Sequence, residues 1–370
     1  MKPPPRSEPG SGTAEAPLGL AELLLPWYRR CGRHDLPWRK TQDDYALWLA
    51  EILLQQTQVR TALPYYGRLL AHFPRWQDLA SAPLDAVLAQ WSGLGYYARA
   101  RNAHRAAQMV VRDHGGRFPK DRASAMALPG VGRSTAAAVL ASAYGQDEAI
   151  LDANARRVLF RAAGLVGEPR SAANDRRLWQ LAAMETPRGT AHDYNQAIQD
   201  LGAIHCRSRR PDCPGCPLRP RCRAAARPEL LNRYEQTHRS ERPQRYATLL
   251  LARDAAGRVL LHRRPEHGIW GGLWSLPILD ATQILADPDQ RAQALERYAS
   301  ACGLRLKAQS LDPVRRHLFS HFQLEYAVLR AQLRAEVVAD GDFGLVCQDI
   351  GSALGLGLPS PIRRLLEQLD

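Results

Sequence analysis

The sequence predicts a multidomain protein in which an all-α region precedes a smaller mixed α+β domain. Its 370 residues suffice for about two domains of ordinary size. Apolar residues in the first two-thirds recur with helical spacing, whereas the last third has short apolar runs separated by turns. Apolar residues make up 45% of the chain and charged residues 24%, which excludes wholesale disorder.

Helical periodicity recurs from Leu18 to about Ala226. Apolar residues three or four positions apart predict one helix across the whole of Asp44–Arg60. The same spacing predicts six further helices, over Pro83–Trp91, Arg99–Asp113, Ser134–Ala143, Ala153–Ala163, Asp175–Thr186 and Asp193–Ile204. Few stretches alternate with the period of a strand, so we predict an all-α domain over residues 18–226.

Polar stretches bound this helical domain on both sides. Residues 1–17 are rich in Pro, Gly, Ser and Glu and have no apolar core, so we expect a disordered tail and not a secretory signal. Residues 227–244 are polar, rich in Arg and Pro and without periodicity, which is typical of a linker. No apolar run approaches the ~20 residues of a membrane span, and we expect a cytoplasmic protein.

Residues 245–370 predict the α+β domain. Two short apolar runs, Tyr246–Ala252 and Val259–Arg263, flank the turn Asp254–Gly257, which is a β-hairpin signal. We expect further strands over Phe322–Leu329 and Ala331–Val338, and helices over Gln290–Ala301 and Pro361–Leu369.

The net charge of +13 is unevenly distributed. Residues 1–244 carry 35 Lys and Arg against 23 Asp and Glu, and the remainder carries 15 against 14. Nearly all of the excess is arginine, whose planar fork suits phosphate groups, and a polyanionic partner would explain it. A bias in genomic base composition would explain the arginines equally well, so charge alone leaves the partner open.

Four of the seven cysteines lie in one short segment, spaced Cys206-x6-Cys213-x2-Cys216-x5-Cys222. Disulfides are rare in the cytosol, so this spacing favours a metal site over structural disulfides. Zinc knuckles usually pair two close C-x2-C hooks, and only one is present here. The wider spacings suit four thiolates around a larger iron–sulfur cluster. Arginines crowd the segment, where they would contact phosphates or offset the charge of the cluster.

A glycine-containing turn, Leu128–Thr135, separates two predicted helices. Gly130 and Gly132 allow a tight turn, and the helix that follows, which contains Ser134, presents free N–H groups to an anion. This is the pattern of a helix-hairpin-helix. A plain interhelical turn is the alternative, but a basic helical domain favours binding to DNA phosphates.

Two carboxylates are candidates for acid–base chemistry. Glu51 lies on a predicted helix that is apolar nearly all round, where desolvation should raise its pKa, although a buried ion pair is the alternative. Asp152 precedes a predicted helix, and by itself is better explained as an ordinary N-cap. Together the two residues would supply a general acid and an anion beside an oxocarbenium ion, as glycoside cleavage requires.

Several of these segments, taken together, resemble the helix-hairpin-helix DNA glycosylases of the endonuclease III superfamily, and within it the MutY-type adenine-specific branch. The resemblance runs from about residue 18 to the C-terminus. It is carried by Leu36–Arg39, Glu51–Val59, Gly93–Arg101, Leu128–Thr135, Ile150–Asn154 and the four-cysteine segment. It implies base excision repair by hydrolysis of the N-glycosidic bond of adenine.

The resemblance implies a role for each matched residue. Glu51 would protonate the adenine and then activate water, Asp152 would stabilise the sugar cation, and Asn154 would be a neighbouring active-site amide. The residues expected to contact DNA or to line the adenine pocket are Arg39, Gln55, Tyr96, Gly130, Gly132, Ser134 and Gln196. A 4Fe–4S cluster would be held by Cys206, Cys213, Cys216 and Cys222, in a structural role because the hydrolysis needs no redox step.

Bifunctional relatives carry a lysine where this chain has Ser134. A serine cannot form the imine through which those enzymes break the strand, so we expect a monofunctional enzyme that leaves an abasic site. A bifunctional glycosylase and AP lyase is the alternative within the superfamily. A non-catalytic iron–sulfur DNA-binding protein is the alternative from another class.

The C-terminal domain resembles the Nudix-like domain of the same branch. Gly271–Pro277 resembles the start of the Nudix signature, but Asp280–Asp289 lacks the acidic metal-binding block, so we expect recognition without nucleotide hydrolysis. Phe319, Ser320 and His321 match the loop for the oxidised guanine opposite adenine. The expected partner is duplex DNA with an A:8-oxoguanine or A:G mispair. We expect no membrane association, a monomer, and a bacterial cytoplasmic protein associated with the nucleoid through DNA.

Overall fold

A computed structural model describes residues 17–231, 234, 242–319, 322–334 and 344–369. Its contacts divide the chain into two compact units, one of residues 1–51 and 118–238 and the other of residues 52–117 and 239–370. The boundary passes through α2 (Asp44–Leu54), so the helical part of the sequence contributes to both units. The domain boundaries predicted along the sequence, residues 18–226 and 245–370, stay a prediction.

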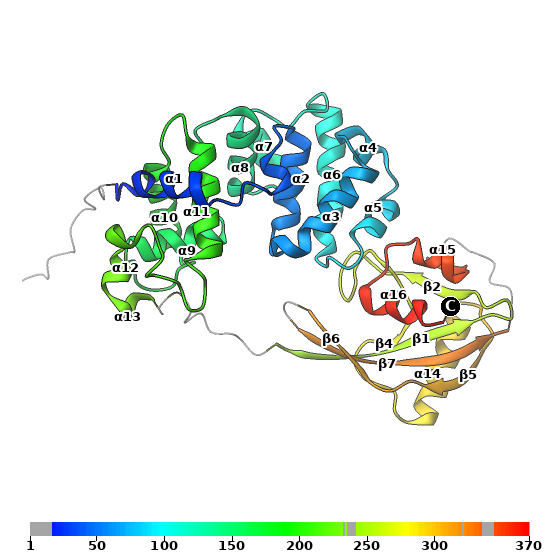
Figure 1. Cartoon of the computed structure of the whole chain (residues 1–370). Helices are drawn as coiled ribbons and strands as arrows, with labels where there is room; N and C mark the ends of the chain where they lie inside the picture. The colour runs from blue at the N-terminus through cyan, green and yellow to red at the C-terminus, as the bar shows by residue number, and fades with distance from the viewer. Residues whose placement is uncertain (1–16, 232–233, 235–241, 320–321, 335–343, 370) are drawn as a thin grey trace, which may run out of the picture. The chain divides into compact units, whose positions relative to one another are not determined.

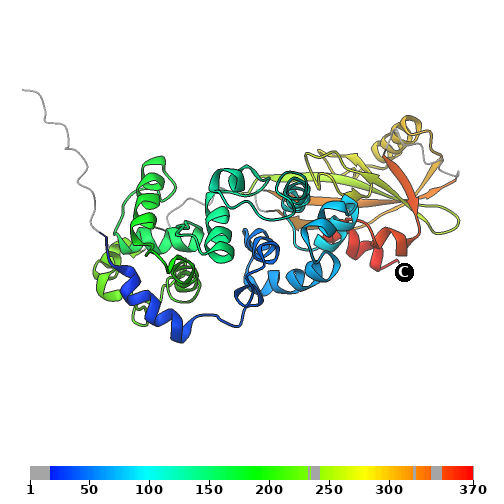
Figure 2. The same ribbon diagram turned by 90° about the horizontal axis from the view of Figure 1, so that it is seen from above.

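In its described residues, the first unit contains helices and no strand. Besides part of α2, it contains α1 (Leu20–Cys31), α7 (Arg122–Ala127), α8 (Arg133–Tyr144), α9 (Ala153–Ala162), α10 (Ala172–Glu185) and α11 (Ala191–Ile204). Two short helices follow, α12 (Arg223–Ala226) and α13 (Pro228–Leu231). α11 packs against α1, α8 and α9, as Figure 2 shows for α1 in dark blue beside the green helices. Leu24, Phe160 and Leu201 are fully buried in the resulting core.

Four helices open the second unit. They are α3 (Val59–His72), α4 (Trp76–Ser81), α5 (Leu84–Trp91) and α6 (Tyr97–Asp113), with α6 packed against α4 and α5. The single helix expected over Asp44–Arg60 is wrong, because the chain breaks between α2 and α3 and Gln56 adopts a φ of 57°. Four polar residues, 55–58, separate the two helices, and the apolar residues beginning at Val59 continue the same helical spacing as those of α2. Periodicity alone therefore could not reveal the break.

The rest of the second unit is a mixed sheet. Its strands are β1 (Gln244–Arg253), β2 (Val259–Arg263), β3 (Trp274–Ser275), β4 (Ile278–Asp280), β5 (Leu306–Leu311), β6 (Arg315–Leu318), β7 (Gln323–Leu333) and β8 (Leu345–Gln348). β1 and β2 are antiparallel neighbours, which confirms the predicted hairpin. β1 also runs parallel to β7 along its whole length, from Gln244 opposite Gln323 to Arg253 opposite Gln332.

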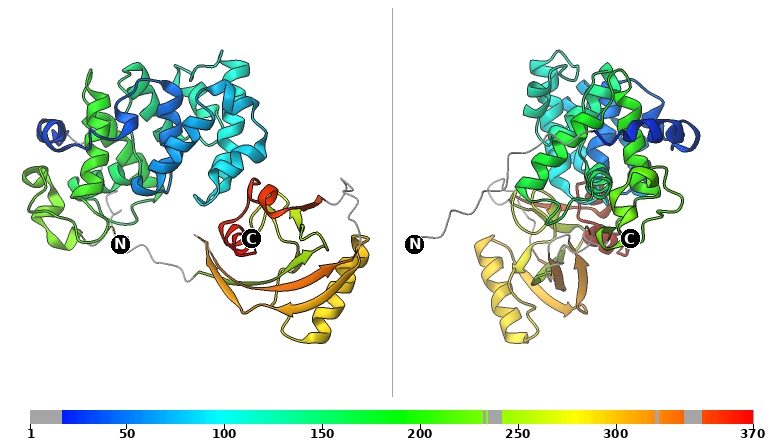
Figure 3. Two further views of the ribbon diagram at one scale, coloured as in Figure 1. Left: turned by 45° about the vertical axis from the view of Figure 1, so that its right-hand side comes forward. Right: turned by 90° about the vertical axis from the view of Figure 1, so that its left-hand side faces the viewer.

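Helices cover both faces of this sheet. α14 (Pro288–Ala301) lies on one face, and α15 (Ile350–Leu354) and α16 (Ser360–Glu367) lie on the other, as Figures 1 and 3 show. Leu250, Leu295 and Leu329 meet in the core between α14 and the sheet. These layers confirm the α+β class. The strands expected over 322–329 and 331–338 are one strand, β7, and residues 335–338 lie outside the described part.

Among the described residues, no helix is long and apolar enough to cross a membrane.

Candidate active site

Glu51 is a half-buried carboxyl group on an otherwise apolar helix. Its neighbours Trp48, Leu49, Ile52 and Leu53 on α2 are all buried. Burial, and after it the negative charge of Asp152, raise the pKa of Glu51 to about 8, although Arg39 opposes the rise. Glu51 therefore carries its proton at neutral pH and can donate it to a bound group.

Asp152 performs the capping role that its position predicts and also interacts electrostatically with Glu51. It is the N-cap of α9, where it accepts a hydrogen bond of 2.7 Å from the backbone N–H of Ala155. Burial raises its pKa, against the Ala155 hydrogen bond and the charge of Arg157. The N-cap explanation is confirmed, and it does not exclude chemistry, because the cap leaves the carboxylate electrostatically coupled to Glu51.

Asn154 is tied to the cysteine segment through Arg157, which sequence reasoning missed. Arg157 donates to the side-chain oxygen of Asn154 at 2.8 Å, and to the carbonyls of Gly202 at 2.7 Å and Cys206 at 2.6 Å. A Cβ at Gly202 would lie 2.6 Å from the Cβ of Asn154, so glycine permits this close approach of α11 to α9. The one available signal was a basic side chain, Arg157, on the apolar face of a predicted helix.

Arg39 is held by Asp200, a second residue that sequence reasoning missed. The Nη1 and Nη2 of Arg39 donate to the two carboxylate oxygens of Asp200 at 2.6 and 2.8 Å. Asp200 is fully buried on α11 and also accepts the backbone N–H and Nε of Arg33. Burial raises the pKa of Asp200, but the bonds from the arginines outweigh it and lower the pKa below its usual value. Gln196 lies buried on the same helix.

The turn between α7 and α8 has the expected geometry. Gly130 adopts a φ of 78°, and Gly132 is the N-cap of α8, with no side chain to occupy the first N–H groups of that helix. Ser134 follows on the first turn, where its hydroxyl accepts a 3.1 Å hydrogen bond from the backbone N–H of Leu151. Ser134 therefore anchors the segment that leads into Asp152, and its contact with DNA stays a prediction.

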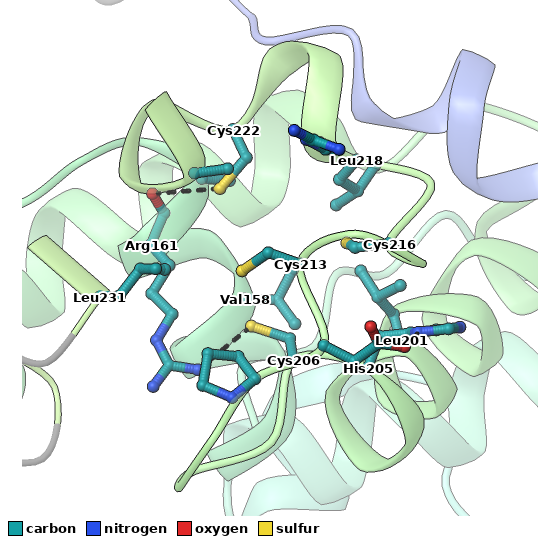
Figure 4. Close-up of a pocket in the computed structure, with 15 residues that line it drawn as sticks. Val158, Arg161, Leu201, His205, Cys206, Cys213, Cys216, Leu218, Cys222 and Leu231 are labelled. Carbon is teal, nitrogen blue, oxygen red and sulfur yellow. Dashed lines mark hydrogen bonds and ion pairs between the residues drawn. The ribbon is translucent and has the colours of Figure 1, made fainter. Parts of the chain in front are cut away.

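The four cysteines line one pocket of the first unit, and in Figure 4 their side chains surround a common space. Arg161, only 2% exposed, donates at 3.5 Å to the sulfur of Cys206 and also to the carbonyls of Arg207 and Ser208. Burial raises the pKa of the Cys216 thiol to about 12, so thiolates here need a compensating cation. In the described part of the chain, no group of three or more His, Cys, Asp or Glu side chains is arranged to hold a metal ion.

In the second unit, Tyr96 and Phe319 line the same open cavity of about 720 Å³. Tyr96 is 42% exposed and adopts a left-handed conformation, with a φ of 49°, at the N-cap of α6. Phe319 stacks on Phe322 with 4.2 Å between ring centroids, and Trp270 lies beside it. Arg242 and Arg245 add positive charge to the lining. Ser320 and His321 lie outside the described residues.

Known proteins match this chain over nearly its whole length. Residues 49–184 match the HhH-GPD superfamily of base excision DNA repair proteins, and residues 248–368 match the NUDIX domain. An adenine DNA glycosylase of Buchnera aphidicola (from Acyrthosiphon pisum) is 30% identical over 94% of this chain and 97% of its own length. The adenine DNA glycosylase of Mus musculus is 34% identical over 82% of this chain and 69% of its own.

The chain belongs to the adenine DNA glycosylase family. It is a DNA N-glycosylase of base excision repair, so the alternative of a non-catalytic iron–sulfur DNA-binding protein is excluded. The matched family span contains both Glu51 and Asp152. A solved thermostable thymine-DNA glycosylase is 32% identical, with a TM-score of 0.52, and covers 56% of this chain and 95% of its own.

The Nudix-like domain of this adenine DNA glycosylase departs from a hydrolase on its helix α14. The described carboxylates of that helix are Asp289 and Glu296, separated by two helical turns, and no acidic pair occupies consecutive positions. Tyr298 and Leu295 turn instead toward the apolar core. The chain therefore matches the NUDIX domain, and the described residues of α14 hold no cluster of carboxylates.

Proposed function

We propose that this adenine DNA glycosylase removes adenine paired with 8-oxoguanine, and with guanine, and leaves an abasic site in an intact strand. The observation that carries the chemistry is the coupled pair of Glu51 and Asp152, which differ in environment as an acid and an anion must. The cavity shared by Tyr96 and Phe319 supports recognition of the opposite base within the second unit.

Glu51 begins the reaction as the neutral acid. It donates its proton to a ring nitrogen of adenine, so the electron pair of the N9–C1′ bond leaves with the neutral base. The sugar becomes an oxocarbenium ion, which the Asp152 carboxylate stabilises at close range. Glu51, now a carboxylate, takes a proton from water as the water oxygen bonds to C1′, and the enzyme returns to its starting state.

The pocket that receives adenine is formed by Arg39 and Gln196. The Nε–H of Arg39 is buried and has no hydrogen-bond partner among the described residues, while Asp200 fixes both Nη atoms. Because the Arg39 side chain is already held in place, its Nε–H can donate a hydrogen bond to a ring nitrogen of adenine without a change of side-chain conformation. Asn154, whose side-chain oxygen accepts a hydrogen bond from Arg157, is the neighbouring amide of this site.

The glycosylase is monofunctional in this proposal. Ser134 lacks the amine of an imine-forming enzyme, and its hydroxyl is engaged with the Leu151 N–H. Only four lysines occur in the chain, Lys2, Lys40, Lys120 and Lys307, and none lies in a matched active-site segment.

The position of the four cysteines around one pocket supports a 4Fe–4S cluster, which is larger than the single metal ion that their present arrangement does not accommodate. Cys206, Cys213, Cys216 and Cys222 would hold this cluster, since they face one space and Arg161 supplies a positive charge and an N–H donor to one sulfur. The bound cluster would supply a rigid anchor for its loop. The arginines of that loop are then placed for DNA phosphates, and α9, which carries Asp152, is fixed through Arg157.

The partner in this proposal is duplex DNA, bound by a monomer. We propose two folding domains, residues 18–226 and 245–370, joined by residues 227–244. Each of the two family matches lies within one of these domains. The Nudix-like domain recognises the damaged base and hydrolyses no nucleotide. The charge excess of residues 1–244 supports non-specific contact with the backbone, and association with the bacterial nucleoid follows from it.

The test is adenine release from duplexes with adenine opposite 8-oxoguanine, guanine or thymine. We expect the fastest release opposite 8-oxoguanine, slower release opposite guanine and none opposite thymine, with strand cleavage only after hot alkali. Equal rates opposite 8-oxoguanine and thymine would refute the proposed specificity. Nicking before alkali would show the bifunctional alternative instead.

A further inference from the structure

One guanidinium in the second unit binds the end of α2 at several points. Arg99 lies in the first turn of α6, and its Nη1 donates to the carbonyls of Ile52 at 3.1 Å and Leu53 at 2.9 Å, and to that of Gln55. Its Nη2 donates to the hydroxyl of Thr57 at 3.0 Å. These acceptors surround the break between α2 and α3, so Arg99 satisfies carbonyls that the helix leaves without a partner.

The same guanidinium also contacts two aromatic rings. Its carbon lies 5.3 Å from the ring centroid of Tyr96 and 5.5 Å from that of Trp91. The backbone N–H of Arg99 donates to the carbonyl of Tyr96 at 2.8 Å. Tyr96 is thus held by side chain and backbone in a left-handed conformation that non-glycine residues rarely adopt.

The charge of Arg99 is compensated by dipoles. Burial lowers its pKa to about 10, so the group is still a cation at neutral pH. Its acceptors are neutral oxygens at the C-terminus of α2, where the helix dipole favours positive charge. A lysine would keep the charge, but a single ammonium cannot reproduce the planar fork that spans these acceptors and contacts both rings.

We propose that Arg99 is a positioning residue that holds Gln55 and Tyr96 as one preorganised element for entry into the duplex. The inference rests on the proposed function, in which both side chains enter the DNA at the mispair. Eversion of adenine from the stack costs free energy. If Gln55 and Tyr96 first had to be ordered, the entropy lost by these side chains would add to that cost. Arg99 contacts no reacting atom, so it acts on eversion of the base and not on bond cleavage.

The variants Arg99→Lys and Arg99→Gln separate fork geometry from charge. Arg105→Gln is the matched control, since Arg105 lies on the same helix, is exposed and bonds only to Asn102 among the contacts described. Each change is made in a Glu51→Gln background, so that eversion is observed without cleavage. The duplex carries 2-aminopurine beside the adenine opposite 8-oxoguanine, because fluorescence of 2-aminopurine rises when its neighbour leaves the stack.

Both Arg99 variants should lower the fluorescence amplitude at least fivefold, while affinity for an undamaged duplex and the thermal midpoint of Arg99→Lys stay close to the parent. Arg105→Gln should match the parent. An amplitude within twofold of the parent for Arg99→Lys would overturn the proposal. Equal losses of amplitude and of undamaged-duplex affinity would also overturn it, as a general structural role.

A Glu51→Gln parent that gives no fluorescence change, together with a wild type that releases no adenine, would refute the proposed function itself. In the cleaving enzyme, the Arg99→Lys defect should shrink on a substrate with adenine opposite an abasic site, where the stack is already weakened. A defect of unchanged size on that substrate would contradict a role in eversion.

Discussion

In the proposed mechanism, the protonation state of Glu51 sets the pH range of the enzyme. Because its pKa is raised to about 8, the acid is available at neutral pH and is lost as the pH rises through that value. The single-turnover rate should fall about tenfold per pH unit above pH 8 and also decline in acid, where Asp152, whose pKa is also raised, becomes protonated. A rate that stays constant to pH 10 would contradict the assignment.

Glu51 should also cost the protein stability. A carboxyl group with a raised pKa binds a proton in the folded state at pH values where the unfolded chain has released it. The free energy of unfolding therefore falls as the pH rises from about 4.5 to about 8. Glu51→Gln removes this penalty and should stabilise the protein by on the order of 2 kcal/mol at pH 8, with little change at pH 4.5.

Chemical denaturation of both proteins at the two pH values measures this difference. Asp289→Asn on α14 is the control, since it removes an exposed carboxylate from the other unit. A Glu51→Gln variant that is no more stable than wild type at pH 8 would show that the carboxyl is ionised in the folded state.

At the scale of single residues, the sequence predicted candidate reacting groups but not the residues that hold the candidate site in place. Glu51 stands out because a carboxylate on an apolar helix is costly, and Asp152 because it precedes a helix. Asp200 and Arg157 act through pairings with residues 161 and 45 positions away, respectively. Such partners are set by tertiary packing, which periodicity does not contain.

At the scale of elements, the cysteine loop depends on Arg161. Its guanidinium bonds to the backbone of the loop at two points and to one sulfur, so Arg161→Gln should loosen the whole segment. We expect loss of iron and sulfide from the purified protein and a thermal midpoint lower by several degrees, since the loop loses the hydrogen bonds that connect it to buried Arg161. Arg209→Gln, at an exposed position of the same loop, should leave both quantities unchanged. Full iron content in Arg161→Gln would contradict this account.

Most of the longer helices and the β1–β2 hairpin were predicted from period and turn chemistry, although α1 and α3 were not delimited and β5 was missed. The strands β3, β4, β6 and β8 were also missed, because each has four residues or fewer. The break after α2 was missed because apolar spacing continues in phase beyond it. That break carries Gln55, so the error fell at a proposed DNA-contacting site, where a local rule gives way to a functional geometry.

At the scale of the whole molecule, the charge distribution predicts salt-dependent binding. The excess lies in residues 1–244, and each neutralised phosphate releases condensed counterions. If six or more phosphates are contacted, affinity for an undamaged duplex should fall by about 10³-fold between 50 and 200 mM salt. Fluorescence anisotropy over this range measures the slope. A slope near zero would show that the arginines serve folding and not DNA binding.

The central claim is that Glu51 and Asp152 hydrolyse the adenine glycosidic bond, and free adenine released in a single turnover measures it most directly. On an A:8-oxoguanine duplex, the wild type should release one adenine per enzyme and leave the strand intact until alkali. Glu51→Gln and Asp152→Asn should bind the same duplex but release adenine about 10²–10⁴-fold more slowly. Release by either variant at the wild-type rate would contradict the account.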